Sequence, residues 1–290
     1  MRFAKYHGTG NDFVMLEDLE DRQTLSQDLV STLCDRHMGV GADGVIRIAP
    51  SADAAFFMDY WNADGNVAEM CGNGIRCLAK YVFDRGLTAK TELTVDTRAG
   101  VKELNLETSE GTVSEVRVDM GTPALTRGEI PMVGPPGDTF VDEPMTAGDA
   151  KYRATAVSMG NPHLVLIGEA DPSDVDLHVL GPALQRHADF PEQTNVEFGR
   201  IADGVIDVRV WERGSGETMA CGTGACASLV AASTIGLVGR KGIVRFPGGE
   251  LDVEWAADDH VYLAGPAVFV FEGEFDATAL GARPTEVTTG

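Results

Sequence analysis

Two cysteines with matching surroundings are the residues of this chain best suited to chemistry. Cys71 and Cys221 are each followed by a Gly-x-Gly turn and preceded by a tryptophan, Trp61 or Trp211. The two segments are separated by a constant offset of 150, from 71 to 221 and from 61 to 211. If the two halves of the chain face each other, the two thiols lie on opposite sides of a small molecule held between them.

Each cysteine is expected to begin a helix, over 73–84 and 223–235, because both segments are apolar and end at a glycine. The first turn of a helix carries N–H groups without helical partners and a partial positive charge. A thiol at that position is expected to have its pKa lowered from ~8.5. The glycines let a carboxylate reach the N–H groups, so an anion site is expected at four residues. They are Gly72, Asn73, Gly222 and Thr223.

A thiolate and an anion cradle in each half suit the inversion of an amino-acid α-carbon. One thiolate removes the α-proton, and the opposite thiol returns a proton on the other face. Fixed N–H groups in a dry cavity stabilise the enediolate-like transition state. Two equivalent cysteines supply an acid and a base of similar pKa, as a two-base reaction requires.

The repeat extends beyond the cysteines and predicts two homologous domains. The period is too long for a solenoid and has the size of a domain. We expect one domain over 1–121, to which 267–290 returns, and a second over 122–266, a structural repeat of the first at offset 150. The other pairs at this offset are Gly10-Asn11 with Gly160-Asn161, Arg36-His37 with Arg186-His187, and Gly86-Leu87 with Gly236-Leu237.

The coarse pattern is that of an α+β protein in which strands surround a central helix in each half, as a mostly antiparallel sheet or barrel. The segment 223–235 is apolar nearly all round, so this helix is expected to be buried. Further helices are expected over 24–37 and 177–187. The segment 123–150 is rich in Pro and Gly and is expected to hold the domain crossover. The strands expected in the second half are 154–157, 164–167, 205–211, 243–246, 251–255, 261–263 and 268–271.

Composition excludes several classes of function. The chain has 290 residues, 43% hydrophobic and 23% charged, with a net charge of −22 that repels nucleic acid. No apolar run approaches the ~20 residues of a membrane span, and residues 1–16 lack a signal-peptide pattern. The five cysteines indicate reduced thiols in the cytoplasm rather than a disulfide framework. Cys34, Cys77 and Cys226 are expected to be small buried hydrophobes.

Two alternative sites have weak patterns. The spacings of Cys71 with Cys77 and of Cys221 with Cys226 do not match a zinc knuckle, so no metal is expected. The segment 39–44 has Gly-x-Gly-x-x-Gly spacing, but it follows a helical segment, whereas a dinucleotide fingerprint follows a strand.

Two alternative functions also use the cysteines. In a thiol hydrolase, Cys71 or Cys221 would pair with His163, and the duplication would then have no purpose. In a binding module without catalysis, the two helix starts would only hold an anion, for which serine would serve as well.

Seven motifs together resemble the diaminopimelate epimerase family, within the cofactor-independent amino-acid racemases, over essentially the whole chain. Relatives acting on proline carry a histidine where this chain has Asn73, and relatives that isomerise phenazine precursors lack the cysteine pair. The motifs are His7-Gly8-Thr9-Gly10-Asn11-Asp12-Phe13, Asn62-Ala63-Asp64-Gly65, Cys71-Gly72-Asn73-Gly74-Ile75-Arg76-Cys77, Ser158-Met159-Gly160-Asn161-Pro162-His163, Glu212-Arg213-Gly214, Glu217-Thr218 and Ala220-Cys221-Gly222-Thr223-Gly224-Ala225-Cys226.

The resemblance implies two pseudosymmetric domains with the active site in the interdomain cleft, and no pyridoxal phosphate or other cofactor. It implies interconversion of LL- and meso-diaminopimelate in lysine and peptidoglycan precursor biosynthesis, with Cys71 and Cys221 as the acid–base residues. It also implies a cytoplasmic homodimer. Phe271 stands where some relatives carry a tyrosine in the dimer contact, and Gly44 where some carry a substrate-binding glutamine.

The symmetric substrate predicts roles for further residues. Arg213 can grip the distal carboxylate bidentately, and Glu212 can accept the distal ammonium. His163 and Glu212 are expected to tune the pKa of the thiols. Amide contacts to substrate are expected from Asn11, Asn62, Asn161 and Asn195, with Asn11 and Asn161 at equivalent positions of the repeat.

Overall fold

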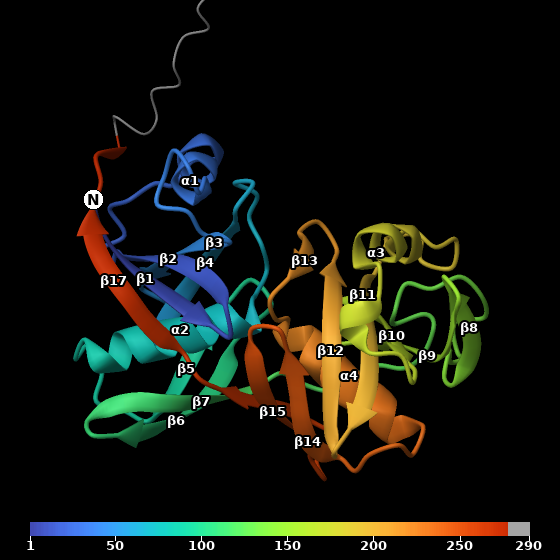
Figure 1. The fold of residues 1–290 in the computed structure, drawn as a ribbon. Helices are drawn as coiled ribbons and strands as arrows, with labels where there is room; N and C mark the ends of the chain where they lie inside the picture. The colour runs from blue at the N-terminus through green and yellow to red at the C-terminus, as the bar shows by residue number, and fades with distance from the viewer. Residues whose placement is uncertain (278–290) are drawn as a thin grey trace, which may run out of the picture. The chain divides into compact units, whose positions relative to one another are not determined.

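The computed structural model describes residues 1–277, which form two compact units. Unit 1 holds 1–8, 12–114 and 267–277, and unit 2 holds 9–11 and 115–266. Strands and helices occur in both units, so the predicted α+β class is confirmed (Figure 1). The predicted domain limits, 1–121 and 122–266, stay a prediction. The part of the predicted return segment that covers 278–290 lies outside the described residues.

Unit 1 is built on a sheet in the order β17-β1-β2-β3-β4-β5-β6. The β2–β3 and β4–β5 pairs are parallel, and the β1–β17, β3–β4 and β5–β6 pairs are antiparallel. Its elements are β1 (Arg2–Gly8), β2 (Asn11–Glu17), α1 (Gln27–Cys34), β3 (Gly44–Ala49), β4 (Phe56–Asn62), α2 (Gly72–Asp84), β5 (Glu92–Asp96), β6 (Lys102–Ser109) and β17 (Val268–Glu274).

Unit 2 repeats this arrangement in the order β8-β9-β10-β11-β12-β14-β15-β16, and β7 pairs with β16. The parallel pairs are again the third and fifth, β10–β11 and β12–β14. The elements are β7 (Thr112–Asp119), β8 (Glu143–Ala147), β9 (Ala150–Ser158), β10 (Pro162–Ile167), the 3-10 helix η1 (Pro172–Asp174), α3 (Leu177–Gln185), β11 (Asn195–Ala202), β12 (Val205–Glu212), β13 (Gly216–Thr218), α4 (Gly222–Thr234), β14 (Lys241–Phe246), β15 (Gly249–Trp255) and β16 (Val261–Gly265).

The register of the ladders shows which residues of the two units are equivalent. Helices α2 and α4 are offset by 150, as the sequence predicts. In the parallel pairs, Met15 lies opposite Ile46, and Val165 lies opposite Glu197. Since Met15 and Val165 are also offset by 150, Ile46 and Glu197 occupy the same place in the two folds.

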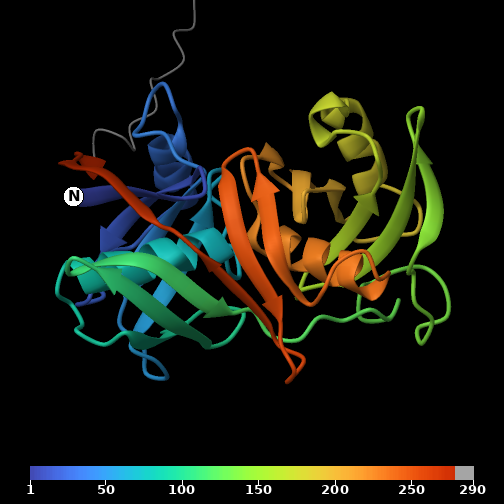
Figure 2. The same cartoon turned by 60° about the horizontal axis from the view of Figure 1, so that its bottom comes forward.

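A helix in contact with strands lies at the core of each unit. Helix α2 packs against β1, β3, β6 and β17, and Figure 2 shows the red β17 running across it. Helix α4 contacts seven strands of unit 2, from β9 to β16, and its residues 224–232 are all buried. The prediction that the second helix is buried is therefore confirmed. No helix within residues 1–277 is long and apolar enough to cross a bilayer.

The first predicted helix is too long. The sequence predicts 24–37, whereas α1 covers Gln27–Cys34. The side chain of Ser26 accepts a hydrogen bond from Leu29 N and caps the helix. At the other end Asp35 adopts an extended conformation, which stops the helix.

Three strands of unit 2, β8, β11 and β13, are not predicted by the sequence pattern. Strand β11 carries polar Asn195 and Glu197 at buried positions, which interrupts the apolar run expected of a buried strand. Strand β8 contains Pro144 and is largely exposed, and it forms because it pairs with β9. Strand β13 has three residues and pairs with β12.

Candidate active site

Cys71 is the N-cap residue of α2, with φ −140° and ψ 119°. Its Sγ accepts a hydrogen bond from Gly74 N at 3.4 Å, and its carbonyl accepts from Ile75 N at 2.9 Å. The side chain is half-buried. The N–H groups of Gly72 and Asn73 follow in the first turn of this helix.

Cys221 occupies the same position on α4, with φ −127° and ψ 122°. Its Sγ accepts from Gly224 N at 3.4 Å, and its carbonyl accepts from Ala225 N at 2.9 Å. The residue is 5% exposed. The prediction that each cysteine begins a helix is confirmed, one residue earlier than expected at each start.

The predicted lowering of the thiol pKa is wrong for Cys221. Burial raises the pKa of this thiol well above its ordinary value, and the carboxylates of Glu212 and Glu197 raise it further. Hydrogen bonds from Thr223 and Gly224 N act in the opposite direction but do not prevail. The positive end of α4 is therefore outweighed by desolvation and two anions, which leaves Cys221 a thiol at neutral pH.

Glu212 accepts a hydrogen bond from this thiol. Cys221 Sγ lies 3.2 Å from Glu212 Oε2, and Thr218 Oγ1 donates to Glu212 Oε1. Burial raises the pKa of Glu212 as well, against the two hydrogen bonds that lower it. The predicted pairing of Glu212 with a thiol thus has direct geometric support.

A chain of hydrogen bonds leads from the buried interior of unit 2 to the same thiol. Glu197 Oε1 lies 2.7 Å from His163 Nδ1, and His163 Nε2 lies 3.0 Å from Asn161 Oδ1. Asn161 Nδ2 donates to Thr223 Oγ1 at 3.4 Å, and Thr223 Oγ1 lies 3.4 Å from Cys221 Sγ. The predicted residues His163, Asn161 and Thr223 are therefore brought together, with His163 reaching the thiol only through the others.

The sequence analysis assigns no role to two buried charged residues near the helix starts, Glu197 and Arg76. Glu197 is 0% exposed on β11. Arg76 is also 0% exposed, and its guanidinium donates to Gly72 O at 3.1 Å and to Asn73 Oδ1 at 3.0 Å. Buried charges of this kind require partners, so a charged residue inside an otherwise apolar segment is the signal that could have found both.

Asn195 bonds to the backbone of Arg213, the residue predicted to bind the distal carboxylate of the substrate. Its Nδ2 donates to Pro162 O at 2.9 Å, and its Oδ1 accepts from Arg213 N at 2.8 Å. Arg213 is exposed, and its Nη1 donates to Glu192 O at 3.0 Å. The contact of Asn195 with substrate stays a prediction, while its contacts in the structure place it behind Arg213.

Asn11 and Asn62 lie at strand ends. Asn11 is buried and belongs to the 9–11 segment of unit 2, where Thr9 O and Met219 O approach Gly248. Asn62 ends β4 at the turn where Gly65 N donates to Asn62 O at 2.9 Å. Their amide contacts with substrate stay predictions.

Gly44 has no room for a side chain. A Cβ there would lie 2.6 Å from Trp61 O and 2.7 Å from Tyr60 Cε2. The position at which some relatives carry glutamine is thus closed in this chain by β4.

The structure weakens the alternative functions. The 39–43 segment leads from α1 into β3 and opens no helix, so it lacks the context of a dinucleotide fingerprint. Cys221 and His163 contact other groups, so they form no direct nucleophile–base pair. Within residues 1–277 no group of three or more His, Cys, Asp or Glu is arranged to hold a metal.

All five cysteines are free, and Cys34, Cys77 and Cys226 are buried as predicted. Burial raises the pKa of Cys34 to about 12. Burial also raises the pKa of Cys77. Both thiols are therefore inert at neutral pH.

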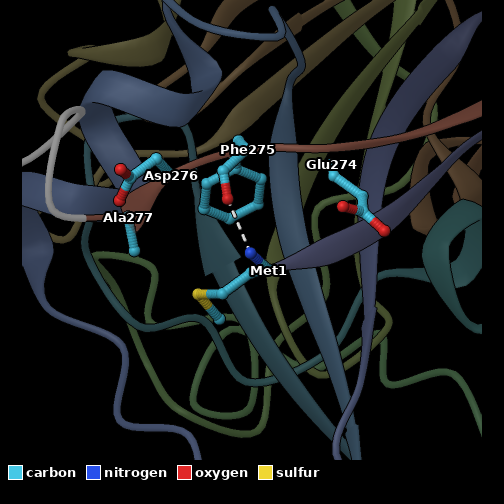
Figure 3. A pocket seen from close by; sticks show the side chains of 5 residues that line it. All are labelled: Met1, Glu274, Phe275, Asp276 and Ala277. Atoms are coloured by element: carbon cyan, nitrogen blue, oxygen red, sulfur yellow. Dashed lines mark hydrogen bonds between the residues drawn. The ribbon is translucent and has the colours of Figure 1, made fainter.

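A surface hollow in unit 1 is unrelated to these residues. It is lined by Met1 and by residues 274–277, and the amino group of Met1 donates to Phe275 O at 2.6 Å (Figure 3). None of the predicted site residues lines it.

Comparison with known proteins shows that the chain is similar in sequence to diaminopimelate epimerases. A family model described as diaminopimelate epimerase matches residues 3–126 and 155–270. The diaminopimelate epimerase of Pelotomaculum thermopropionicum is 48% identical over 278 residues, covering 95% of this chain and 99% of the relative. That of Methanococcus maripaludis is 45% identical, covering 95% of this chain and 100% of the relative.

Solved structures of more distant proteins share the fold. A hydroxyproline epimerase from Agrobacterium vitis, with bound trans-4-hydroxy-L-proline, matches with a TM-score of 0.68 at 15% identity, over 99% of this chain and 96% of the other. A phenazine biosynthesis protein of the PhzF family from Bacillus anthracis matches with a TM-score of 0.67 at 17% identity, over 95% and 98%.

Proposed function

This chain belongs to the diaminopimelate epimerase family, and from that premise we propose that it interconverts LL- and meso-diaminopimelate with Cys71 and Cys221 as its two acid–base groups. The resemblance predicted from the motifs is confirmed by the family match and by relatives at 45–48% identity. Both thiols act on one α-carbon, and no cofactor takes part.

One observation carries this proposal: the two cysteines cap the two equivalent helices with the same geometry. The N–H groups of Gly72, Asn73, Gly222 and Thr223 belong to first helical turns, where a carboxylate is stabilised by the helix dipole. As the α-proton leaves, negative charge develops on that carboxylate, and N–H groups already in place stabilise it most in the transition state.

The roles of the two thiols differ at the start of a turnover. Cys221 rests as a thiol that donates to Glu212, so it is ready to act as the acid. Cys71 then acts as the base on the stereoisomer whose α-proton it reaches. In the reverse reaction the proton on Cys71 returns to the carbon, and Cys221 becomes the base, with Glu212 and Thr223 adjusting its pKa.

The distal end of the substrate is recognised by Arg213 and its neighbours. An exposed guanidinium whose backbone is fixed by Asn195 can bind a carboxylate through two parallel hydrogen bonds. Amide groups of Asn11, Asn62 and Asn161 complete the binding of the ammonium and carboxylate groups. His163 acts on the thiol through Asn161 and Thr223.

Incubation with LL-diaminopimelate in D₂O without added cofactor tests the reaction. We expect formation of the meso isomer with one deuterium at the inverted α-carbon, measured by NMR and mass spectrometry. Absence of both exchange and inversion would contradict the proposal. Inversion of proline or hydroxyproline instead would assign the site to a different amino acid.

The protein acts as a homodimer through β17. Val268, Phe269, Val270 and Phe271 are 42–50% exposed along this strand, an apolar row that is unusual on a free surface. Val270→Lys should lower the molar mass measured by light scattering from dimer to monomer. Val179→Lys, at an apolar residue that is 61% exposed on α3, is the matched control and should leave the mass unchanged.

The cellular setting follows from the reaction and the thiols. The product belongs to lysine and peptidoglycan precursor biosynthesis, which is the pathway of this family. Five free cysteines suit the reducing cytoplasm, where such thiols persist.

A further inference from the structure

The carboxylate of Glu197 is buried below the first turn of α4 with half of its hydrogen-bonding capacity unused. The residue is 0% exposed, and its Oε1 lies 2.7 Å from His163 Nδ1. Its Oε2 is buried without a hydrogen-bond partner. Leaving a buried carboxylate oxygen unpaired costs free energy, so its presence requires a reason other than stability.

This carboxylate lies close to the thiol of Cys221. A Cβ placed on Gly224 would be 2.8 Å from Glu197 Oε1 and 3.4 Å from Cys221 Sγ. Because both atoms are near one point, they are separated by no more than about 6 Å. At such a distance in a dry site, one negative charge strongly disfavours a second.

The equivalent place in unit 1 shows that packing does not require a charge. There Ile46 occupies the position of Glu197, and a Cβ on Gly74 would lie 2.7 Å from Ile46 Cδ1. An apolar side chain therefore supports the first turn of α2 in the same way. At this equivalent position, the unit with Cys221 has a carboxylate where the unit with Cys71 has an alkyl group.

We propose that Glu197 is a positioning residue of the second thiol site: its buried carboxylate orients His163 and holds Cys221 in the protonated form that donates to Glu212. Glu197 does not touch substrate in this scheme. Glu197 thereby gives the acid role to Cys221 and not to Cys71, although both thiols cap a helix in the same way. The two cysteines of the duplicated fold then differ in function.

The hydrogen-bond directions agree with this role. A carboxylate and an amide oxygen can only accept, so His163 donates from both ring nitrogens, Nδ1 to Glu197 and Nε2 to Asn161. Glu197 is the member of this pair that raises the pKa of Cys221. Asn161 Nδ2 then donates to Thr223. The groups facing Cys221 are thus Glu212 from β12, Glu197 from β11, with His163 of β10 behind it, and Thr223 and Gly224 N from α4 itself.

Alkylation of the thiols as a function of pH tests the proposal without substrate. Iodoacetamide labelling, resolved at each cysteine by mass spectrometry, gives the midpoint pH for Cys221. Glu197→Gln keeps the size and a hydrogen bond to His163 but removes the charge, so the midpoint should fall by about one pH unit or more. The midpoint of Cys71 in the same molecules should stay unchanged.

A second substitution and a control keep the test independent of folding. Glu197→Leu copies the apolar residue of unit 1 and should lower the Cys221 midpoint in the same direction. Val196→Ala loosens the same strand without removing a charge and should leave the midpoint at the wild-type value. An unchanged Cys221 midpoint in either folded Glu197 variant, or an equal fall in Val196→Ala, would overturn the proposal.

The kinetic consequence rests on the proposed function, whereas the labelling does not. For the stereoisomer that needs Cys221 as a thiol, the high-pH limb of kcat/KM should move to lower pH in both Glu197 variants. If the shift in labelling occurs in a protein without epimerase activity, the role of Glu197 stands and the proposed function fails.

Discussion

The first turns of α2 and α4 have nearly the same backbone but differ in the buried charges beside them. In both, a cysteine caps the helix and its Sγ accepts from the N–H three residues later at 3.4 Å. Next to Cys71 a buried guanidinium, that of Arg76, is bonded to the first turn of the helix. Next to Cys221 lie the carboxylates of Glu212 and Glu197 instead.

The substitutions behind this difference are few. Offset by 150 from Arg76 stands Cys226, and the ladder registers make Ile46 of β3 the counterpart of Glu197 of β11. Duplication therefore preserved the geometry that holds a thiol and a carboxylate ligand, while single side chains under each helix start changed the charge. Two cysteines in the same Cys-Gly-x-Gly motif need not share a pKa, because the pKa depends on neighbours brought in by the fold.

Removal of either thiol should have the largest effect. Cys71→Ala and Cys221→Ala should each reduce epimerisation by at least the roughly 10²- to 10⁴-fold that a general acid or base contributes. The readout is the rate of isomer conversion in a coupled or NMR assay, with circular dichroism to confirm folding. Cys34→Ala, at a buried thiol outside the site, is the control. Near-normal turnover by either site variant would refute a two-base reaction.

The buried guanidinium of unit 1 should matter more for stability than its counterpart in unit 2. Arg76→Met removes the guanidinium bonds to Gly72 O and Asn73 Oδ1 and should cost about 2–4 kcal/mol in the free energy of unfolding. Cys226→Ala removes only a small buried side chain and should cost about 1 kcal/mol. Urea unfolding of both variants measures the difference. Equal costs would mean that Arg76 does not support the first turn of α2.

The two thiols should differ in reactivity in the wild-type protein. Because burial and two carboxylates raise the pKa of Cys221, iodoacetamide at about pH 8 should label Cys71 faster by on the order of tenfold or more. Glu212→Gln removes one anion and should speed the labelling of Cys221 alone. Similar rates at both cysteines in the wild type would show that the electrostatic difference has no chemical consequence.

The smallest effect is expected at the residue behind Arg213. Asn195→Ala loses the acceptor for Arg213 N and the donor to Pro162 O, a loss of about 1 kcal/mol that corresponds to a roughly fivefold higher KM. Asn195→Asp keeps the acceptor and should stay closer to the wild type. Steady-state kinetics distinguish the two, and a fall in kcat with unchanged KM would instead place Asn195 in the chemical step.

The sequence predicts the helix caps and the central helix well because these depend on local pattern. A cysteine before a Gly-x-Gly turn and an apolar segment leads directly to a capped helix, and residues apolar on all sides lead to a buried one. Strand β11 was not predicted, because it depends on contacts with other segments of the chain and not on local pattern. Its polar residues are buried because partners from β10 and the β12–β13 turn bond to them, as with His163 and Glu197 or Arg213 N and Asn195.

By itself, the sequence determined that this protein has two equivalent halves, that each begins a helix at a cysteine, and which family it resembles. The tertiary structure decided that burial and two carboxylates raise the pKa of the Cys221 thiol, because Glu212 of β12 and Glu197 of β11 approach it in space. It also decided that Arg76 is buried against the first turn of α2 and that Gly44 admits no side chain. Charge and burial act over distances of a few ångströms in space, which spacing along the chain does not encode.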